Sequence, residues 1–354
     1  MNRRGCNEGW IMKLSIVVPV YNMAGEGKLN YCMDSLLNQT LPHEDYEIIP
    51  VDDKSTDSSL EILKDYERKH QDRVHVIASS ENRRQGGAKN LGIKEAKGEW
   101  LGIIDSDDWI SPDMYEKLLK KAEETGADAV GCDYTLVQEH TMKPGKTVQN
   151  NTDDQTGVLD EARFKKLFMR SGSMVIKIVK RQMVVENELW FPEHIFYEDN
   201  CASPLWMLHC KHFEKVNEPL YYYYQHETST VHHVSEERCM DRMKALELLV
   251  EECKKRNLYE KYQEELEGKF AELYLKNTLF SYMQGDQPKR LTFLKKLRKG
   301  MLERFPTFEK NMYYEKIADQ EEKKLLHYYK QSVLFFYCYY KLLYFYRKKR
   351  NKNR

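Results

Sequence analysis

Short apolar runs alternate with amphipathic stretches along the first third of the chain. Four of these runs are rich in β-branched and other apolar residues, which predicts strands buried on both faces of a sheet. They cover residues 14–20, 47–51, 74–78 and 100–104. Positions with helical spacing lie between them, at 28–39, 58–70 and 88–96. Strands and helices that alternate in this way predict a parallel, doubly wound α/β sheet, whose ligand crevice lies at the carboxyl ends of its strands.

The alternation continues as far as Tyr224. It predicts helices at 112–125, 159–170 and 200–211, strands at 128–134 and 215–224, and a polar loop at 141–156. Beyond Ser235 a Leu, Glu and Lys periodicity predicts three or four helices, with breaks near 285–288 and 300–306. We therefore expect a disordered extension at 1–11, an α/β domain at 12–233 and a helical region at 234–354.

The charge of the chain is balanced overall but uneven along its length. Its 354 residues are 41% hydrophobic and 32% charged, which suits a globular protein with a sizeable core. Because 56 basic residues oppose 56 acidic ones, no global basic field indicates a nucleic-acid partner. Six of the cations follow Tyr346, so residues 1–346 carry a net charge of −6.

The cysteine pattern favours a cytoplasmic protein. Eight cysteines occur without any C-x-x-C pair, which predicts reduced thiols rather than a disulfide framework or a zinc site. The first apolar run is too short for a signal peptide, contains Pro19, and is interpreted as the first strand.

An acidic cluster ends the fourth apolar run, in the sequence WLGIIDSDDWI. Asp105, Asp107 and Asp108 place three carboxylates within four residues, and like charges at such spacing repel one another. A solvated acidic turn is the simpler alternative. Hard divalent cations, however, take carboxylate ligands together with substrate phosphates. At the carboxyl end of a strand, the cluster therefore indicates a site for a metal and a diphosphate.

Five motifs occur in an order that resembles a known family. They are IVVPVYN at 16–22, VDDKSTD at 51–57, GGAKNLGIKEAKGEW at 86–100, DSDD at 105–108 and YED at 197–199. Across residues 12–230 the chain resembles a family 2 glycosyltransferase of the bacterial surface-polysaccharide type. The resemblance implies the A-type glycosyltransferase fold, which is α/β and Rossmann-like with a largely parallel central sheet, here followed by a C-terminal α-helical extension. It divides the catalytic domain into a nucleotide-sugar-binding half at 12–110 and an acceptor half at 111–233.

The resemblance assigns donor-binding roles to the first two strand ends. Pro19, Tyr21 and Asn22 follow or end the first strand, and Tyr21 is expected to stack on the nucleobase of a nucleotide-sugar donor. Asp53 is expected to accept a hydrogen bond from the base ring, while Asp52 orders the loop. The alternative for this pair is a cluster that caps a helix.

Further donor and metal contacts are implied on either side of the fourth strand. Arg83, Arg84 and Lys89 are candidate cations for the diphosphate, with a solvated basic patch as the alternative. Lysine stands at 89 where the family more often has arginine, and lysine lacks the bidentate grip on an oxyanion. Asp105 and Ser106 are expected to contact the donor. Asp105 and Asp107 form the D-x-D pair that binds Mn²⁺ or Mg²⁺, and Asp108 is a further candidate ligand.

The catalytic residues implied by the resemblance are Asp199 and Glu198. Asp199 would be the general base that takes a proton from the acceptor hydroxyl, and Glu198 would contact a sugar. A single displacement of this kind inverts the anomeric configuration. His226 is a candidate third metal ligand, set against the alternative of a surface histidine. The Q-x-x-R-W signature of processive synthases is absent, which favours addition of one sugar.

Two other function classes remain in view. A catalytically idle nucleotide-sugar-binding or scaffold member would keep the same fold. A nucleotidyltransferase would need a glycine-rich G-x-G-x-R loop after the first strand, which YNMAGEGKLN does not provide. By analogy with relatives, the acceptor is expected to be a glycan or a lipid-linked intermediate.

The aromatic stretch at 333–346 raises the question of membrane contact. It is apolar around its helical circumference apart from Lys341. At ~1.5 Å per residue it reaches about 21 Å, short of the ~30 Å hydrocarbon core. With the basic end that follows, residues 333–354 favour contact at the inner face of the cytoplasmic membrane. The alternatives are a helix packed in the core and a homo-oligomer interface.

Overall fold

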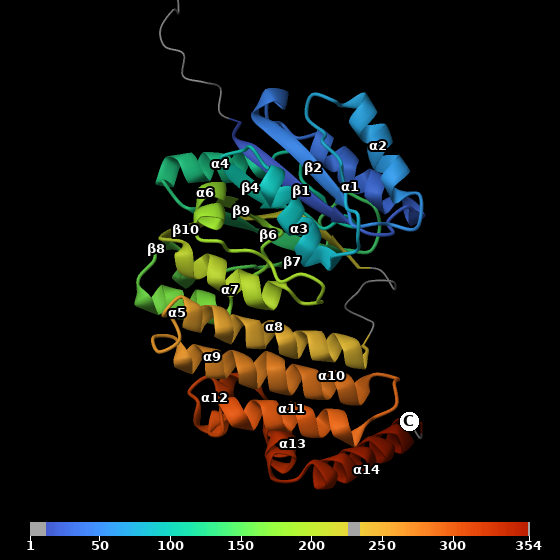
Figure 1. Cartoon of the computed structure of the whole chain (residues 1–354), viewed down its shortest axis with the longest axis vertical. Coiled ribbons are helices and arrows are strands. Elements are labelled where there is room, and N and C mark those ends of the chain that lie inside the picture. Colours follow the sequence, from blue (N-terminus) through green and yellow to red (C-terminus); the bar gives the residue numbers. More distant parts are fainter. Residues whose placement is uncertain (1–11, 226–233, 353–354) are drawn as a thin grey trace, which may run out of the picture. The chain divides into compact units, whose positions relative to one another are not determined.

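The computed structural model describes residues 12–225 and 234–352, and within these ranges the chain forms two compact units (Figure 1). Residues 12–194 and 201–225 form the first unit, and residues 195–200 and 234–352 form the second. The sheet and the helices around it belong to the first unit. The second unit is helical.

The first unit is built on a mixed, largely parallel sheet with the strand order β3-β2-β1-β4-β9-β6-β10-β5. Three neighbouring strands, β2, β1 and β4, are parallel, and β10 is parallel to β6. The bounds are β1 Leu14–Val20, β2 Tyr46–Asp52, β3 Ile77–Ala78, β4 Trp100–Ile103, β5 Trp109–Ile110, β6 Ala129–Val137, β9 Lys177–Lys180 and β10 His212–Tyr224. Val20 lies opposite Asp52, and Val17 lies opposite Ile103, so the polar residues that follow these strands emerge at one edge.

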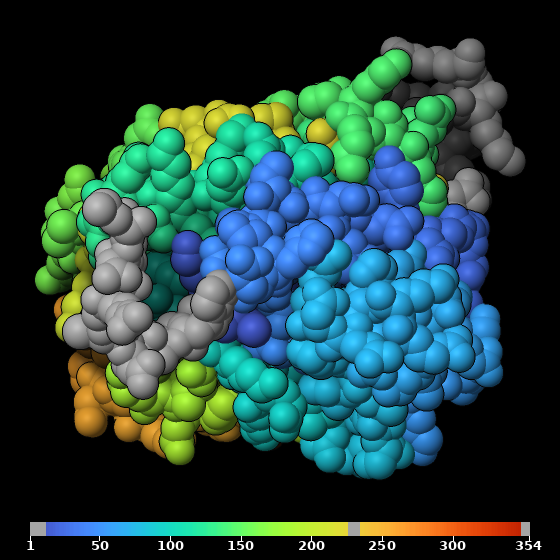
Figure 2. Space-filling model, turned by 90° about the horizontal axis from the view of Figure 1, so that it is seen from above, coloured from blue at the N-terminus to red at the C-terminus, as the bar shows by residue number. Residues whose placement is uncertain are grey.

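The helices between the strands lie close to the ranges that the apolar periodicity predicts, except the short helix Arg181–Glu186, which was not predicted. They are α1 Lys28–Leu37, α2 Ser59–Lys69, α3 Arg84–Glu95, α4 Met114–Thr125, α5 Glu161–Met169, α6 Arg181–Glu186 and α7 Asp199–His209. In a view from above, α2 and the residues next to it form a continuous light-blue part of the surface (Figure 2). Helix α3 packs closely on β1, since a Cβ atom added at Gly92 would lie 2.4 Å from Cγ1 of Val17. Glycine at this position permits the close approach.

Three local predictions differ from the structure. The strand expected at 74–78 is reduced to β3, with one isolated bridge between Ile48 and Val74. The helix expected to begin at residue 88 begins at Arg84. Its first turn has no apolar side chain, so the apolar periodicity could not indicate where the helix begins. Strand β9 was not predicted, and it runs antiparallel between β4 and β6. Only two residues of this strand, Ile178 and Val179, are apolar, and lysines flank them, so the run is too short for periodicity to identify.

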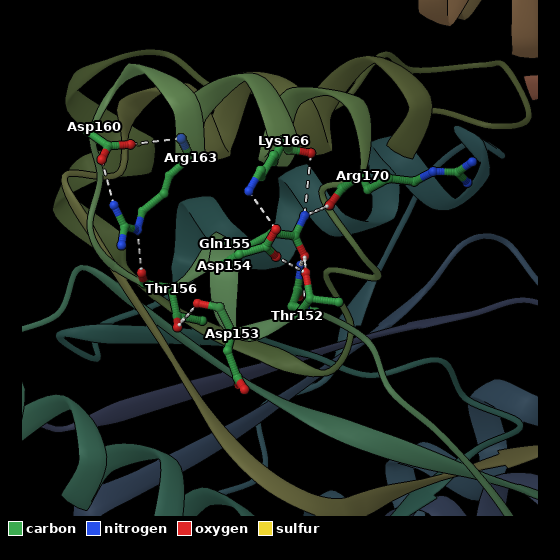
Figure 3. A network of polar contacts seen from close by, with 10 residues as sticks. Thr152, Asp153, Asp154, Gln155, Thr156, Asp160, Arg163, Lys166 and Arg170 are labelled. Atoms are coloured by element: carbon green, nitrogen blue, oxygen red, sulfur yellow. Dashed lines mark hydrogen bonds and ion pairs between the residues drawn. The ribbon is translucent and has the colours of Figure 1, made fainter. Parts of the chain in front are cut away.

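The segment expected as a polar loop at 141–156 contains β7 Lys146–Val148, which pairs with β6, and a helical turn at Asp153–Gln155. Figure 3 shows the polar network that fixes this turn to α5. Thr152 and Gln155 form a capping box, and Nε2 of Gln155 donates to the carbonyl oxygen of Arg170 over 2.7 Å. Nζ of Lys166 donates to Asp154 over 2.5 Å. Side-chain hydrogen bonds satisfy backbone polar groups of this turn, so it forms without an apolar pattern in the sequence.

The second unit contains more helices than the three or four expected. They are α8 Glu236–Lys255, α9 Gln263–Lys269, a π-helical stretch at Phe270–Asn277, α10 Thr278–Gln284, α11 Leu291–Arg304, α12 Tyr314–Ile317, α13 Gln320–Gln331 and α14 Val333–Lys352. The break expected near 285–288 is present, whereas Gly300 lies inside α11 and that helix ends at Arg304. Of the helices described here, none is both long and apolar enough to cross a bilayer.

Strand β9 buries Lys177, an unusual residue for the core of the sheet. Its ammonium group donates to the carbonyl oxygen of Ser173 over 2.7 Å and lies 5.7 Å from the centre of the Phe213 ring. Burial lowers the pKa of Lys177 from 10.5 to about 7, since desolvation disfavours the charged form.

The lowered pKa predicts a pH-dependent stability that Lys177→Met should abolish. Between pH 7 and 10.5 the unfolded state binds one more proton than the folded state at this residue, so wild-type stability rises with pH there. The slope approaches ~1.4 kcal/mol per pH unit at most. Chemical denaturation of both proteins from pH 7 to 10 measures it. The control is Lys180→Met, on the same strand with a partly exposed side chain paired to Asp128. Parallel pH profiles for wild type and Lys177→Met would contradict the prediction.

Candidate functional site

The loop after β1 is fixed to the loop after β2 by Asn22. This residue has a positive φ of 54°, which asparagine tolerates better than most side chains. Its amide oxygen accepts a hydrogen bond from the backbone N–H of Thr56 over 2.7 Å, and its own N–H donates to Oγ of Ser55 over 3.0 Å. Pro19 is buried within β1, whereas Tyr21 is 47% exposed at the end of that strand. The aromatic ring is thus available on the edge where a ligand would bind.

Asp52 ends β2, Asp53 follows it, and both are almost fully buried. Oδ2 of Asp52 accepts a hydrogen bond from the N–H of Ser55, which orders the loop as expected for this residue. Oδ1 of Asp53 accepts from the N–H of Arg83 over 2.7 Å, just before α3 begins. Burial raises the pKa of Asp53, and backbone hydrogen bonds from Arg83 and Arg84 oppose that shift. One oxygen of Asp53 therefore has the helix-capping role that the sequence left open.

Helix α3 carries two of the candidate cations for a diphosphate, and the third, Arg83, precedes its first residue. Arg84 is its first residue, is partly exposed, and has a positive φ of 60°. Lys89 lies one turn further on and is only 4% exposed. Its ammonium group is 5.1 Å from the centre of the Phe191 ring and 3.4 Å from Oε1 of Gln85. Arg84 is thus the more accessible of the two cations.

A clamp that the sequence did not reveal holds residues 191–194 against α3. Asn90 donates to the carbonyl oxygen of Phe191 and to Oε1 of Glu193, and it accepts from the N–H of Phe191. Arg83 forms an ion pair with Glu193 over 3.1 Å, and its carbonyl oxygen accepts from the N–H of His194. These contacts join residues about a hundred positions apart, which local patterns cannot predict.

The acidic turn after β4 contains two partly exposed carboxylates and one buried carboxylate. Asp105 and Asp107 are partly exposed, while Ser106 and Asp108 are buried. Oδ2 of Asp108 accepts from the Tyr221 hydroxyl over 2.6 Å, and Oδ1 accepts from the N–H of Tyr224 over 2.8 Å. Burial first, and then the Asp107 and Asp105 carboxylates, raise the pKa of Asp108 well above its ordinary value. A raised pKa favours the neutral form of Asp108, so this carboxyl adds less negative charge to the turn than the sequence predicts.

The donor set of this turn fits a divalent cation that is shared with a substrate. In the described part of the chain, no three His, Cys, Asp or Glu side chains are arranged to hold a metal by themselves. Mg²⁺ commonly uses one or two carboxylates together with substrate phosphates and water, and Asp105 and Asp107 match that requirement. Asp108, by contrast, uses both oxygens to hold β10. His226, the candidate third ligand, lies outside the described residues.

The candidate catalytic residues lie in the segment 195–200 of the second unit, which is anchored on α8. The Arg238 guanidinium lies 4.5 Å from the ring centre of Phe196, and that of Arg242 lies 4.3 Å from the ring centre of Tyr197. Next to these rings, Glu198 is buried and Asp199 is exposed at the start of α7. Exposure distinguishes Asp199 as the carboxylate that solvent, and so an acceptor, can reach.

Comparison with known proteins places the chain in a family. Residues 15–179 match glycosyl transferase family 2. The chain is 32% identical to EpsH of Bacillus subtilis over 312 residues, which cover 84% of this chain and 85% of EpsH. It is 36% identical over 184 residues to the poly(ribitol-phosphate) beta-glucosyltransferase of Bacillus spizizenii. That match covers 52% of this chain but only 27% of the longer relative.

Solved structures show the fold. TarS 1–349 of S. aureus, determined in complex with UDP-GlcNAc, matches with a TM-score of 0.69 and 21% identity over 90% of this chain and 88% of TarS 1–349. A mannosyltransferase from Pyrobaculum calidifontis, determined with GDP-Man and Mn²⁺, matches with a TM-score of 0.50 and 15% identity over 89% of this chain and 87% of that one. The expected A-type fold with a helical C-terminal region is thereby confirmed. Given the match to EpsH over most of both chains, this protein belongs to glycosyl transferase family 2 and is a glycosyltransferase.

Proposed function

We propose that the protein transfers one sugar from a UDP-sugar to an acceptor hydroxyl, with inversion of the anomeric configuration and with Mn²⁺ or Mg²⁺ as cofactor. The observation that supports this most directly is the shared edge of β1, β2 and β4. An exposed aromatic ring at Tyr21 and the carboxylates of Asp105 and Asp107 follow adjacent parallel strands there. A ring that can stack on a base and carboxylates that can hold a metal–diphosphate are what a nucleotide sugar requires.

The relatives favour the donor and acceptor classes. TarS, which shares the fold, was determined with UDP-GlcNAc, and the Bacillus spizizenii relative is named for glucosyl transfer to poly(ribitol phosphate). By extension, the acceptor of this protein is a hydroxyl of a surface polysaccharide or of a lipid-linked intermediate, at the cytoplasmic side of the membrane. Residues 12–110 would bind the donor and residues 111–233 the acceptor. The absence of the Q-x-x-R-W signature favours transfer of a single sugar.

Each site residue has a defined part in the proposed donor complex. Tyr21 stacks on the uracil, and the Asp53 carboxylate accepts from the base ring. Ser106 and Asp105 orient the ribose, and Arg84 contacts the diphosphate more readily than the buried Lys89. Asp105 and Asp107 would hold the cation, which when bound neutralises charge on the leaving diphosphate.

The proposed reaction is a single displacement. The Asp199 carboxylate accepts the proton of the acceptor hydroxyl while the hydroxyl oxygen forms a bond to the anomeric carbon. The bond from that carbon to the diphosphate oxygen breaks, and UDP leaves with the electron pair. Attack on the opposite face inverts the configuration, so no protein nucleophile is needed. A positioned base of this kind contributes ~10²–10⁴-fold to the rate.

Donor and acceptor tests decide between transfer and the idle alternative. In the presence of Mn²⁺, calorimetry should show UDP binding at least tenfold more tightly than GDP, and UDP should be released from UDP-GlcNAc or UDP-glucose when poly(ribitol phosphate) or a lipid-linked glycan is added. Equal affinity for UDP and GDP would contradict the choice of nucleotide. UDP-sugar binding without release, over a panel of such acceptors, would favour the scaffold alternative.

A further inference from the structure

Helix α14 has one buried face and one exposed apolar face. On the buried face, the Phe336 ring lies 5.1 Å from that of Tyr329 on α13, and the ring centres of Tyr340 and Phe280 are 6.5 Å apart. Val333 is also buried, so this face holds the helix to the second unit. On the opposite face, apolar side chains are exposed to solvent, and Leu342 is 69% exposed.

The exposed apolar residues form a stripe rather than scattered positions. Leu334, Cys338, Leu342 and Phe345 are exposed and follow one another at intervals of four, four and three residues, which places them on one side of a helix. Phe335 and Tyr346 are exposed beside them. Single exposed apolar side chains are ordinary on protein surfaces, but a continuous row of them indicates an interaction surface.

The charges of this helix all have one sign. Residues 333–352 contain six cations and no acidic residue, and five of the cations follow Tyr346. Arg347 forms an ion pair with Glu321 of α13, which holds the start of the basic segment to the unit. Lys341 lies within the apolar stripe, where a long side chain can extend its ammonium group to a polar boundary while its methylene groups stay in apolar contact.

We propose that the exposed face of α14 docks on an anionic membrane surface, with the helix in the plane of the interface. Apolar side chains would enter the headgroup boundary, and the basic end would lie against anionic headgroups. None of the described helices could span the bilayer instead. A second copy of the chain is a poorer partner. Two-fold pairing of this face would bring together two helices whose charged side chains are all positive. This inference rests on α14 alone and does not depend on the proposed donor or reaction.

Vesicle co-sedimentation of the full chain tests the docking. Wild-type protein should pellet with phosphatidylcholine vesicles that contain phosphatidylglycerol, and much less with phosphatidylcholine alone. Leu342→Ser with Phe345→Ser should weaken binding at least tenfold, as should Lys348→Gln with Lys349→Gln and Arg350→Gln. The matched control is Val158→Ser with Met312→Ser, which removes two exposed apolar side chains elsewhere and should bind like wild type.

Three results would overturn the proposal. Wild-type protein could fail to pellet with anionic vesicles, or the Leu342→Ser and Phe345→Ser variant could pellet as well as wild type. Analytical ultracentrifugation could instead show a dimer that this variant dissociates, without vesicle binding, which would assign the face to a second copy. Both sites are exposed, so the thermal unfolding midpoint should stay unchanged and loss of binding cannot be attributed to unfolding.

Discussion

Asp199→Asn should lower sugar transfer by ~10²–10⁴-fold, the usual contribution of a general base. Asparagine keeps the size of the side chain and much of its hydrogen bonding but cannot accept the proton. Donor binding should survive, because Asp199 is assigned to the acceptor step and not to the nucleotide. Initial rates of UDP release with saturating donor and acceptor measure the first effect, and calorimetry with UDP measures the second.

Glu198→Gln is the matched control for this substitution. Glu198 is adjacent in sequence but buried, whereas Asp199 is exposed, so the two substitutions make the same chemical change in different surroundings. We expect Glu198→Gln to lower transfer far less than Asp199→Asn does, because Glu198 is assigned to a sugar contact and not to the proton transfer. Near-normal transfer by Asp199→Asn, together with loss of transfer in Glu198→Gln, would move the base to Glu198. Loss of UDP binding in Asp199→Asn would instead show that this residue serves the donor.

The segment that carries these two residues shows how a site can depend on contacts that sequence patterns do not contain. Phe196 donates its backbone N–H to Asp241, and two arginines of α8 lie over the rings of Phe196 and Tyr197. The YED motif identifies the carboxylates, but α8 follows some forty residues later and appears in the sequence only as an amphipathic helix. Its part in holding the motif depends on tertiary packing.

The ends of β1, β2 and β4, by contrast, could be predicted from local sequence signals. Each of β1, β2 and β4 is a dense apolar run that stops abruptly at polar residues, so both the strand and its functional end are local signals. The strand order of the other half is not a local property. Strand β9 enters the sheet antiparallel between β4 and β6, and it brings a lysine into the core where composition predicts an exposed residue.

Asp108 combines a predictable position with contacts that the sequence does not indicate. Its position in DSDD was predictable, but its partners Tyr221 and Tyr224 lie at the far end of the first unit's sequence, 113 residues away in the case of Tyr221. The three acidic side chains of DSDD look equivalent in the sequence. In the fold, Asp108 joins the turn to β10, whereas Asp105 and Asp107 remain partly exposed. Substitutions of these residues should therefore have different consequences.

Asp107→Ala and Asp108→Ala should therefore separate metal binding from folding. Asp107→Ala should lower transfer by about 10²-fold or more, since it removes a carboxylate that would hold the cation at the diphosphate. It should leave the thermal unfolding midpoint unchanged. Asp108→Ala should instead cost about 1–3 kcal/mol of stability, because the buried Tyr221 hydroxyl and the Tyr224 N–H lose their acceptor. Thermal unfolding measures stability, and UDP calorimetry in Mn²⁺ and in EDTA measures the metal dependence of donor binding.

UDP calorimetry in Mn²⁺ and in EDTA tests whether donor binding requires the metal. Wild-type protein should bind UDP much more weakly in EDTA, because the carboxylates of the turn repel a diphosphate when no cation lies between them. Asp107→Ala should show a smaller difference between Mn²⁺ and EDTA, since it loses both a metal ligand and a source of that repulsion. Equal UDP affinity of the wild type in Mn²⁺ and in EDTA would remove the metal from the proposed reaction. A destabilised Asp107→Ala together with an unaffected Asp108→Ala would exchange the roles assigned to the two residues.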